Sequence, residues 1–149
     1  MNKLYEYIRK LFMSDNDWNK LNDINWEEIQ DIFKPEEFKC PCCGKLNISP
    51  DIIKKLVIAR KILNQPIIIT SGCRCKKHNE KIGGSVTSSH ICSTNQQGYA
   101  VDILVTNSHY RFLLLRALIL AGFNRIGEGK DFFHVDIDIN KPQEVKWLY

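Results

Sequence analysis

The chain has 149 residues, of which 44% are hydrophobic and 26% are charged, and its formal net charge is +4. This length suits one domain that buries its own core, and the composition is typical of a globular protein. No apolar run approaches the roughly 18 residues that a membrane-spanning helix needs. We therefore expect a monomer that binds no nucleic acid and inserts into no membrane. The mild positive charge suits an anionic polymer as partner.

Residues 1–35 are predicted to form a helical extension that packs on the rest of the chain. Apolar residues recur there at helical spacing in two runs, Leu4 to Phe12 and Trp18 to Phe33. Charges are scattered through the first ten residues, which argues against a signal peptide. We expect synthesis in the cytoplasm, and any action outside the cell would need another route, such as lysis.

Residues 36–149 are predicted to form an α+β domain, with a small, mostly antiparallel sheet and flanking helices. A loop over 34–48 should precede a helix that Ser49 caps, and 72–84 should be a loop with one helical turn. The predicted helices cover 50–64 and 109–121. The predicted strands cover 66–70, 99–105, 124–128 and 132–139.

Two histidines and one aspartate are candidate metal ligands. His134 shares the polar face of the last predicted strand with Asp136, because side chains alternate across a strand. Asp102 interrupts an otherwise apolar strand, where a carboxylate is costly unless it is paired or binds a metal. With His90, these residues could bind zinc and leave a fourth position for water, as in catalytic sites. Each of them alone could instead be a satisfied polar residue.

Several ordered motifs carry a resemblance to a known family. The chain has S-x-H at 88–90, G-x-A-x-D at 98–102 and H-x-D at 134–136. This order resembles the signature of the zinc D-alanyl-D-alanine carboxypeptidase-like, or LAS-type, metallopeptidases. That family includes bacterial cell-wall peptidases, phage endolysins and the hedgehog signalling domain. The S-G-x-R segment at 71–74 and the H-N and G-G pairs within 78–84 also look like the family.

The resemblance runs from about residue 36 to 139 and implies roles by position. His90, Asp102 and His134 would bind one catalytic zinc ion, and the loaded site would carry a charge of about +1. Arg74 would hold a substrate carboxylate or the developing oxyanion. Ser88 would bind substrate or orient the first ligand.

The general base is expected three residues before the last ligand, where family members with an E-x-x-H pattern place a glutamate. Asp131 occupies that position here, with a shorter side chain. Glu128 and Asp136 are the alternatives. Asp136 is the more natural partner for orienting a metal ligand.

The connection between the first two ligands departs from the family. Asp102 follows His90 by twelve residues, whereas relatives usually have about seven. Residues 91–97 therefore form an insertion that includes Cys92. We expect it to lie beside the site, where it could reshape substrate access and bring Cys92 towards the metal.

Six cysteines are present, at 40, 42, 43, 73, 75 and 92. Without a signal peptide, reduced thiols or metal ligands are favoured over a disulfide framework. Cys40, Cys43, Cys73 and Cys75 are the candidate ligands of a second, structural zinc ion. The alternatives are buried free thiols or one disulfide.

The leading hypothesis is a zinc peptidase that hydrolyses an amide bond in peptidoglycan stem peptides. It could be a D-Ala-D-Ala carboxypeptidase or an L-Ala-D-Glu endopeptidase, and it looks like a phage endolysin or a virion-associated enzyme. The alternative is a zinc-containing module that binds the cell wall, or serves a phage structurally, without hydrolysis. The position of the general base should discriminate between the two.

Overall fold

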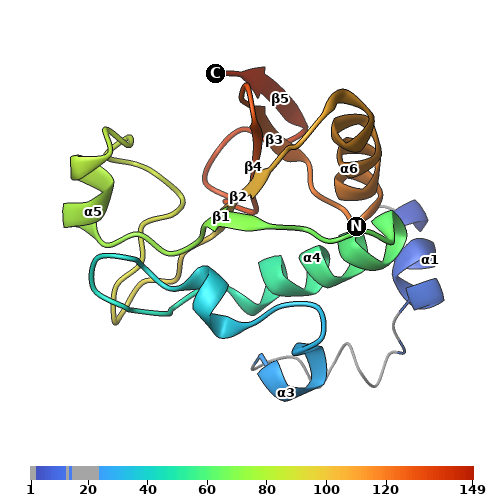
Figure 1. Ribbon diagram of the computed structural model, residues 1–149, viewed down its shortest axis with the longest axis horizontal. Coiled ribbons are helices and arrows are strands. Elements are labelled where there is room, and N and C mark those ends of the chain that lie inside the picture. Colours follow the sequence, from blue (N-terminus) through green and yellow to red (C-terminus); the bar gives the residue numbers. More distant parts are fainter. Residues whose placement is uncertain (1–2, 13, 15–23) are drawn as a thin grey trace.

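The computed structural model describes residues 3–12, 14 and 24–149 (Figure 1). The helices are α1 (Lys3–Phe12), α3 (Trp26–Ile29), the 3-10 helix η1 (Pro35–Phe38), α4 (Pro50–Leu63), α5 (Lys76–Lys81) and α6 (Ser108–Leu120). The strands are β1 (Ile69–Ser71), β2 (Ala100–Leu104), β3 (Arg125–Glu128), β4 (Phe132–Asp136) and β5 (Val145–Leu148). Within the described part of the chain, no helix is both long and apolar enough to cross a membrane.

The strands form one sheet in the order β1-β2-β4-β3-β5. The pairs β1–β2, β2–β4 and β3–β4 are antiparallel, and β3–β5 is parallel. The predicted α+β fold with a mostly antiparallel sheet is thus confirmed. In the register of this sheet, Asp102 of β2 lies opposite His134 of β4, and Gly127 of β3 lies on the other side of His134. Two candidate ligands therefore meet at the same level of adjacent central strands.

The two faces of strands β2 and β4 have different surroundings. Val101, Ile103, Phe133 and Val135 are fully buried and belong to the hydrophobic core. Helices α4 and α6, which pack against each other, contribute their apolar faces to the same core. Because side chains alternate, Asp102 and His134 must project from the opposite face. The core thus supports the strands from behind the candidate site.

The described part of the N-terminal extension joins this core. Helix α1 contacts α4 and α6, and Tyr5, Ile8 and Ile29 are buried in the common cluster. Figure 1 shows α1 beside α4 and α6, at the end of the molecule far from α5. The predicted helical run around Trp18 and Leu21 lies outside the described residues.

Element boundaries differ from the predictions where backbone hydrogen bonds change. The first strand starts at Ile69 rather than at Pro66, which has no N–H to donate to a sheet. Strand β4 ends at Asp136 rather than at 139, because the Asp136 and Asp138 carboxylates accept hydrogen bonds from backbone N–H groups two residues ahead and turn the chain. Strand β5 was not predicted, and η1 interrupts the predicted loop over 34–48.

Candidate metal centre

Three donor atoms converge on the open face of the sheet. His90 Nε2 lies 3.1 Å from Asp102 Oδ1 and 3.2 Å from His134 Nδ1, and the last two atoms are 3.0 Å apart. Strands β2 and β4 position Asp102 and His134, whereas His90 comes from the long loop that precedes β2. The structure thus brings together the three residues that the sequence singled out.

The spacing and chemistry of these atoms fit a metal ion. Ligands about 2.0–2.1 Å from a tetrahedral zinc ion are about 3.3 Å apart, close to the separations seen here. Both histidine rings are buried, with exposures of 1% and 7%. A cation between the donors would satisfy two imidazole lone pairs and one carboxylate at once, and three protein ligands leave a coordination position free.

Hydrogen bonds behind the rings select the tautomers that a metal needs. His90 Nδ1 lies 2.8 Å from the carbonyl oxygen of Gly72, so its N–H donates there and Nε2 keeps its lone pair. His134 Nε2 lies 2.9 Å from Asp136 Oδ2, which leaves Nδ1 as the free nitrogen. Outer partners of this kind fix the ring orientation and raise ligand basicity.

Asp136 is itself held by a buried cation. Its Oδ1 accepts hydrogen bonds from Arg125 Nε at 2.6 Å and from the Asp138 backbone N–H at 3.1 Å. Arg125 is 6% exposed and lies over the Trp147 ring. Burial alone would raise the pKa of Asp136, but the hydrogen bonds from His134 and Arg125 lower it. Asp136 therefore stays ionised against the His134 ring.

We expect Asp136→Asn to weaken zinc binding by about 10–100-fold, because His134 loses the charge that orients it. Competition with a zinc chelator would measure the affinity. Asp138→Asn is the matched control, since Asp138 lies two residues further along and bonds Ser89 rather than a ring. Equal affinities of the two variants would contradict the assigned role.

The surroundings of the three donors favour a proton on His134 more than on His90. Burial lowers the pKa of His90. Burial also acts to lower the pKa of His134, but its hydrogen bonds to Asp102 and Asp136 outweigh this and raise it. The pKa of Asp102 is held far below its usual range by its hydrogen bonds with the two rings, in spite of burial. A metal would therefore compete mainly with the proton of His134.

A cavity of about 370 Å³ opens over the donors. Its wall is mixed, with basic, hydroxyl and aromatic side chains. The residues that line it include Arg74, Ser88, Ser89, Arg125, Phe132, Lys141, Trp147 and Tyr149. Such a cavity can accommodate a short peptide with an anionic group beside the metal ligands.

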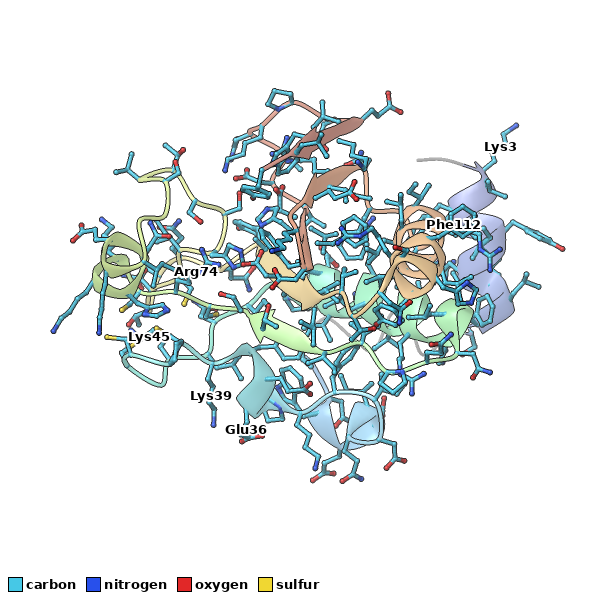
Figure 2. All side chains as sticks on the ribbon, turned by 45° about the horizontal axis from the view of Figure 1, so that its top comes forward. Lys3, Glu36, Lys39, Lys45, Arg74 and Phe112 are labelled. Carbon is cyan, nitrogen blue, oxygen red and sulfur yellow. The ribbon has the colours of Figure 1, made fainter. Side chains whose placement is uncertain are left out.

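Arg74 links the cavity to the metal ligands. Its Nη2 donates to Asp102 Oδ2 at 2.5 Å and its Nε donates to Ser71 Oγ at 2.8 Å. Figure 2 labels Arg74 between the sheet and the end of the molecule where the sulfur atoms gather. Ser88 also lines the cavity, and its Oγ accepts a hydrogen bond from the backbone N–H of His90 at 3.3 Å.

None of the three base candidates presents a free carboxylate to the cavity. Asp131 is exposed in the turn before β4 and does not line the cavity, so the geometry does not support the expectation drawn from motif spacing. Glu128 forms ion pairs with Arg111 and Lys146. Asp136 is engaged with the His134 ring and Arg125.

The insertion at 91–97 lies away from the metal ligands. Asn47 Nδ2 donates to the carbonyl oxygens of Ser93 and Gln96, and Lys45 Nζ donates to Thr94 Oγ1 at 2.7 Å. None of residues 91–97 lines the cavity over the donors. Cys92 is buried, and its hydrogen bond with the Cys73 thiol raises its pKa. The insertion therefore packs against the segment after the first cysteines and brings no thiol to the site.

The other cysteines divide into two groups. The thiols of Cys40, Cys43 and Cys75 lie within 4.8 Å of one another, whereas Cys73 pairs with Cys92. Burial acts to raise the pKa of Cys40, but backbone N–H groups, led by that of Cys75, lower it to about 7. The structure thus brings three of the four predicted cysteine ligands together and places Cys73 elsewhere.

The sequence did not point to two aromatic residues beside the site, Trp147 of β5 and Tyr149 directly after it. The ring centroids of Trp147 and Tyr149 lie 5.6 Å and 6.4 Å from that of His134. Gly127 makes room for them, because a Cβ atom there would come within 2.6–2.7 Å of both rings. Gly127, beside a strand that carries ligand residues, was the available signal of a close approach. Because strand β5 was not predicted, nothing indicated which side chains would pack against this glycine.

Comparison with known proteins agrees with this geometry. No curated protein matches the chain. A protein-family model described as Peptidase M15 matches residues 28–138, a span that contains Arg74 and all three donor residues. Since this match covers most of the chain, the protein belongs to the peptidase M15 family of zinc-dependent metallopeptidases.

Proposed function

We propose that the protein is a zinc peptidase that hydrolyses an amide bond in the stem peptides of peptidoglycan. The observation that carries this proposal is the convergence of His90, Asp102 and His134 at the floor of a cavity, inside a match to the peptidase M15 family. Two neutral imidazoles and one carboxylate with a free coordination position are the donor set of catalytic zinc.

The cavity wall supports a small anionic peptide as substrate. Arg74 and Lys141 place two cationic groups beside the ligands. Arg74 uses Nη2 and Nε for Asp102 and Ser71, which leaves Nη1 for a carboxylate or an oxyanion. Trp147 and Tyr149 supply an apolar wall for methyl side chains such as those of alanine. A D-Ala-D-Ala or an L-Ala-D-Glu bond in a stem peptide fits this chemistry.

The chain's own groups would divide the work of hydrolysis. Bound zinc would lower the pKa of a water molecule and polarise the scissile carbonyl. His90, Asp102 and His134 would hold the ion, and Asp136 keeps His134 in the required tautomer. Arg74 stabilises the negative charge that develops on the substrate. Ser88 Oγ accepts a hydrogen bond from the backbone N–H of His90. Ser88 also lies in the cavity wall, where its hydroxyl can accept a hydrogen bond from the substrate or donate one to it.

We propose that the reaction takes place on the bacterial cell wall. A net charge of +4 favours approach to the anionic cell wall. The action on cell walls would follow release from the cytoplasm in the manner of a phage endolysin, or the protein would be carried by a virion. We propose that it acts as a monomer.

The direct test uses purified cell walls and a soluble stem pentapeptide, each incubated with the zinc-loaded protein. Release of D-alanine would identify a carboxypeptidase, and new amines without free D-alanine would identify an endopeptidase. A chelator should stop either reaction and added zinc should restore it. If zinc is bound and neither substrate yields new amines, the proposal that the protein is a hydrolase is overturned.

We propose Asp131 as the proton acceptor on motif spacing alone, because ion pairs occupy Glu128 and Asp136. Asp131 is exposed in the turn before β4, outside the cavity, and would have to approach the metal ligands to act. We expect Asp131→Asn to lower kcat by about 10²-fold, the low end of the range for general base catalysis, and to leave zinc content unchanged. Steady-state kinetics and metal analysis would measure both. An unchanged kcat would remove Asp131 from the mechanism.

One observation favours a second function. Among the described residues, the only carboxylates that line the cavity are Asp102 and Asp136, and both are engaged. A zinc-containing wall-binding or structural phage module needs no base. Saturable binding to cell walls without any release of amines would favour this second function over hydrolysis.

Metal binding should depend on pH through His134. The raised pKa of this ring means that protons compete with zinc more strongly than at an ordinary histidine. Zinc must displace that proton, so its affinity is expected to fall as pH drops through the raised pKa of His134, which lies above the ordinary histidine value of about 6.5. Metal analysis after equilibrium dialysis would measure the occupancy. Full occupancy of this site at about pH 4.5 would contradict histidine ligation.

A further inference from the structure

A cluster of thiols lies at the end of the molecule occupied by the turn before Lys45. Figure 2 shows sulfur atoms gathered near the labelled Lys45, apart from the sheet. The sulfur atoms of Cys40, Cys43 and Cys75 lie within 4.8 Å of one another, although Cys75 is distant from the other two in sequence. We propose that this cluster binds a second zinc ion with a structural role.

The turn that carries Cys40 and Cys43 is built to present both thiols on one side. The Gly44 N–H donates to the Cys40 carbonyl at 2.8 Å, and the Cys40 N–H donates to the Lys45 carbonyl at 2.9 Å. Gly44 has φ +70°, a conformation that glycine adopts at little cost. Cysteines three residues apart on a tight turn are the usual half of a zinc site.

Cys75 reaches the turn from the loop that follows β1. Its backbone N–H donates to Cys40 Sγ at 3.3 Å, and its own sulfur accepts the backbone N–H of His78 at 3.4 Å. The Cys40 sulfur is the acceptor in the first contact, and the Cys75 sulfur is the acceptor in the second. The thiolate is the form that binds zinc.

Cys42 is the candidate fourth donor. It is exposed, and its thiol forms a hydrogen bond with the Cys75 thiol. Cys73 is less suited, because its sulfur accepts the backbone N–H of Asn47 and bonds the buried Cys92 thiol. Four thiolates around one ion leave no open position, which is the arrangement of structural zinc.

The proposed ion would fasten the segments that carry the catalytic machinery. Cys75 directly follows Arg74, whose backbone N–H donates to the carbonyl of His90 and whose carbonyl accepts from Cys92. The turn on the other side of the ion continues to Lys45 and Asn47, which hold the insertion at 91–97. One ion thus would tie the turn to the loop of Arg74, next to the chain that bears the ligand His90.

Metal content of purified protein tests the proposal without any activity measurement. We expect about two zinc ions per chain in the wild type, and about one in a variant with His90→Ala and His134→Ala, since only the open site is removed. A variant with Cys43→Ser and Cys75→Ser should also hold about one. Cys92→Ala is the matched control, because it removes a thiol outside the cluster, and it should keep both ions.

A spectroscopic measurement covers the case in which the double serine variant fails to fold. Cobalt replaces zinc in the variant with His90→Ala and His134→Ala, which leaves all six thiols in place. We expect the intense sulfur-to-cobalt charge-transfer absorption of a tetrahedral thiolate site, and we expect bound metal to protect Cys40, Cys42, Cys43 and Cys75 from alkylation. Metal-free protein after loading, or a disulfide within the cluster, would overturn the proposal. Neither outcome would bear on hydrolysis at the first site.

Discussion

Replacement of His134 with alanine is expected to remove the metal of the histidine–aspartate site and to abolish hydrolysis. The loss should exceed the about 10²–10³-fold effect of deleting one oxyanion-hole donor, because it removes the group that activates water as well. His134 supplies one of three donors, and its Nδ1 lies 3.0–3.2 Å from both of the others. His90→Ala removes the donor that the loop before β2 carries, and it should give the same result.

Zinc content and release of amines from cell walls, measured on the same samples, would check this expectation. His109→Ala is the matched control, since this exposed histidine at the start of α6 removes an imidazole far from the donors. The circular dichroism spectra should agree across the set. Activity of His134→Ala or His90→Ala near that of the wild type, with chelator still inhibitory, would mean that the metal sits elsewhere.

The sequence predicted the donor residues because their positions follow from local rules. A polar residue within an apolar strand and the alternation of β4 are visible in one dimension, and they put His134 and Asp136 on one face. The family resemblance added His90, which lies in a loop whose path no periodicity predicts. The sheet register that sets Asp102 opposite His134 is non-local, so it came only from the structure.

The misses have a common physical cause, which is contact between distant segments. Strand β5 is short and, within the described part of the chain, pairs with β3 alone, so its pattern is weak without that partner. Trp147 reaches the site through this pairing, whereas Arg125 reaches Asp136 through the pairing of β3 with β4. Cys73 was grouped with Cys75 as a zinc ligand because one residue separates them in the sequence, but its thiol forms a hydrogen bond with the Cys92 thiol.

Arg74→Ala is expected to lower kcat/KM by about 10²–10³-fold, the range for loss of one group that stabilises the oxyanion. Two effects add in the same direction. The cavity loses a cation that can pair with the substrate carboxylate, and Asp102 loses the guanidinium that holds its Oδ2. A free Oδ2 would let the carboxylate rotate away from the position in which Oδ1 faces the two rings.

Arg74→Lys separates charge from geometry. Lysine keeps the positive charge, but one ammonium group cannot contact Ser71 and Asp102 in the forked manner of Nε and Nη2. We expect activity between that of the wild type and that of Arg74→Ala, with zinc content close to the wild type. Arg116→Ala, at an exposed position of α6, is the control for loss of one positive charge in approach to the wall.

The division between KM and kcat identifies which of the two roles of Arg74 dominates. A rise in KM alone would mean that Arg74 binds the ground-state carboxylate, whereas an equal fall in kcat and kcat/KM would mean that it acts on the transition state. We expect the second result on an endopeptidase substrate without a terminal carboxylate, and both effects on a D-Ala-D-Ala substrate. Wild-type kinetics for Arg74→Ala on both substrates would exclude Arg74 from binding and catalysis, and its ion pair with Asp102 would then be structural.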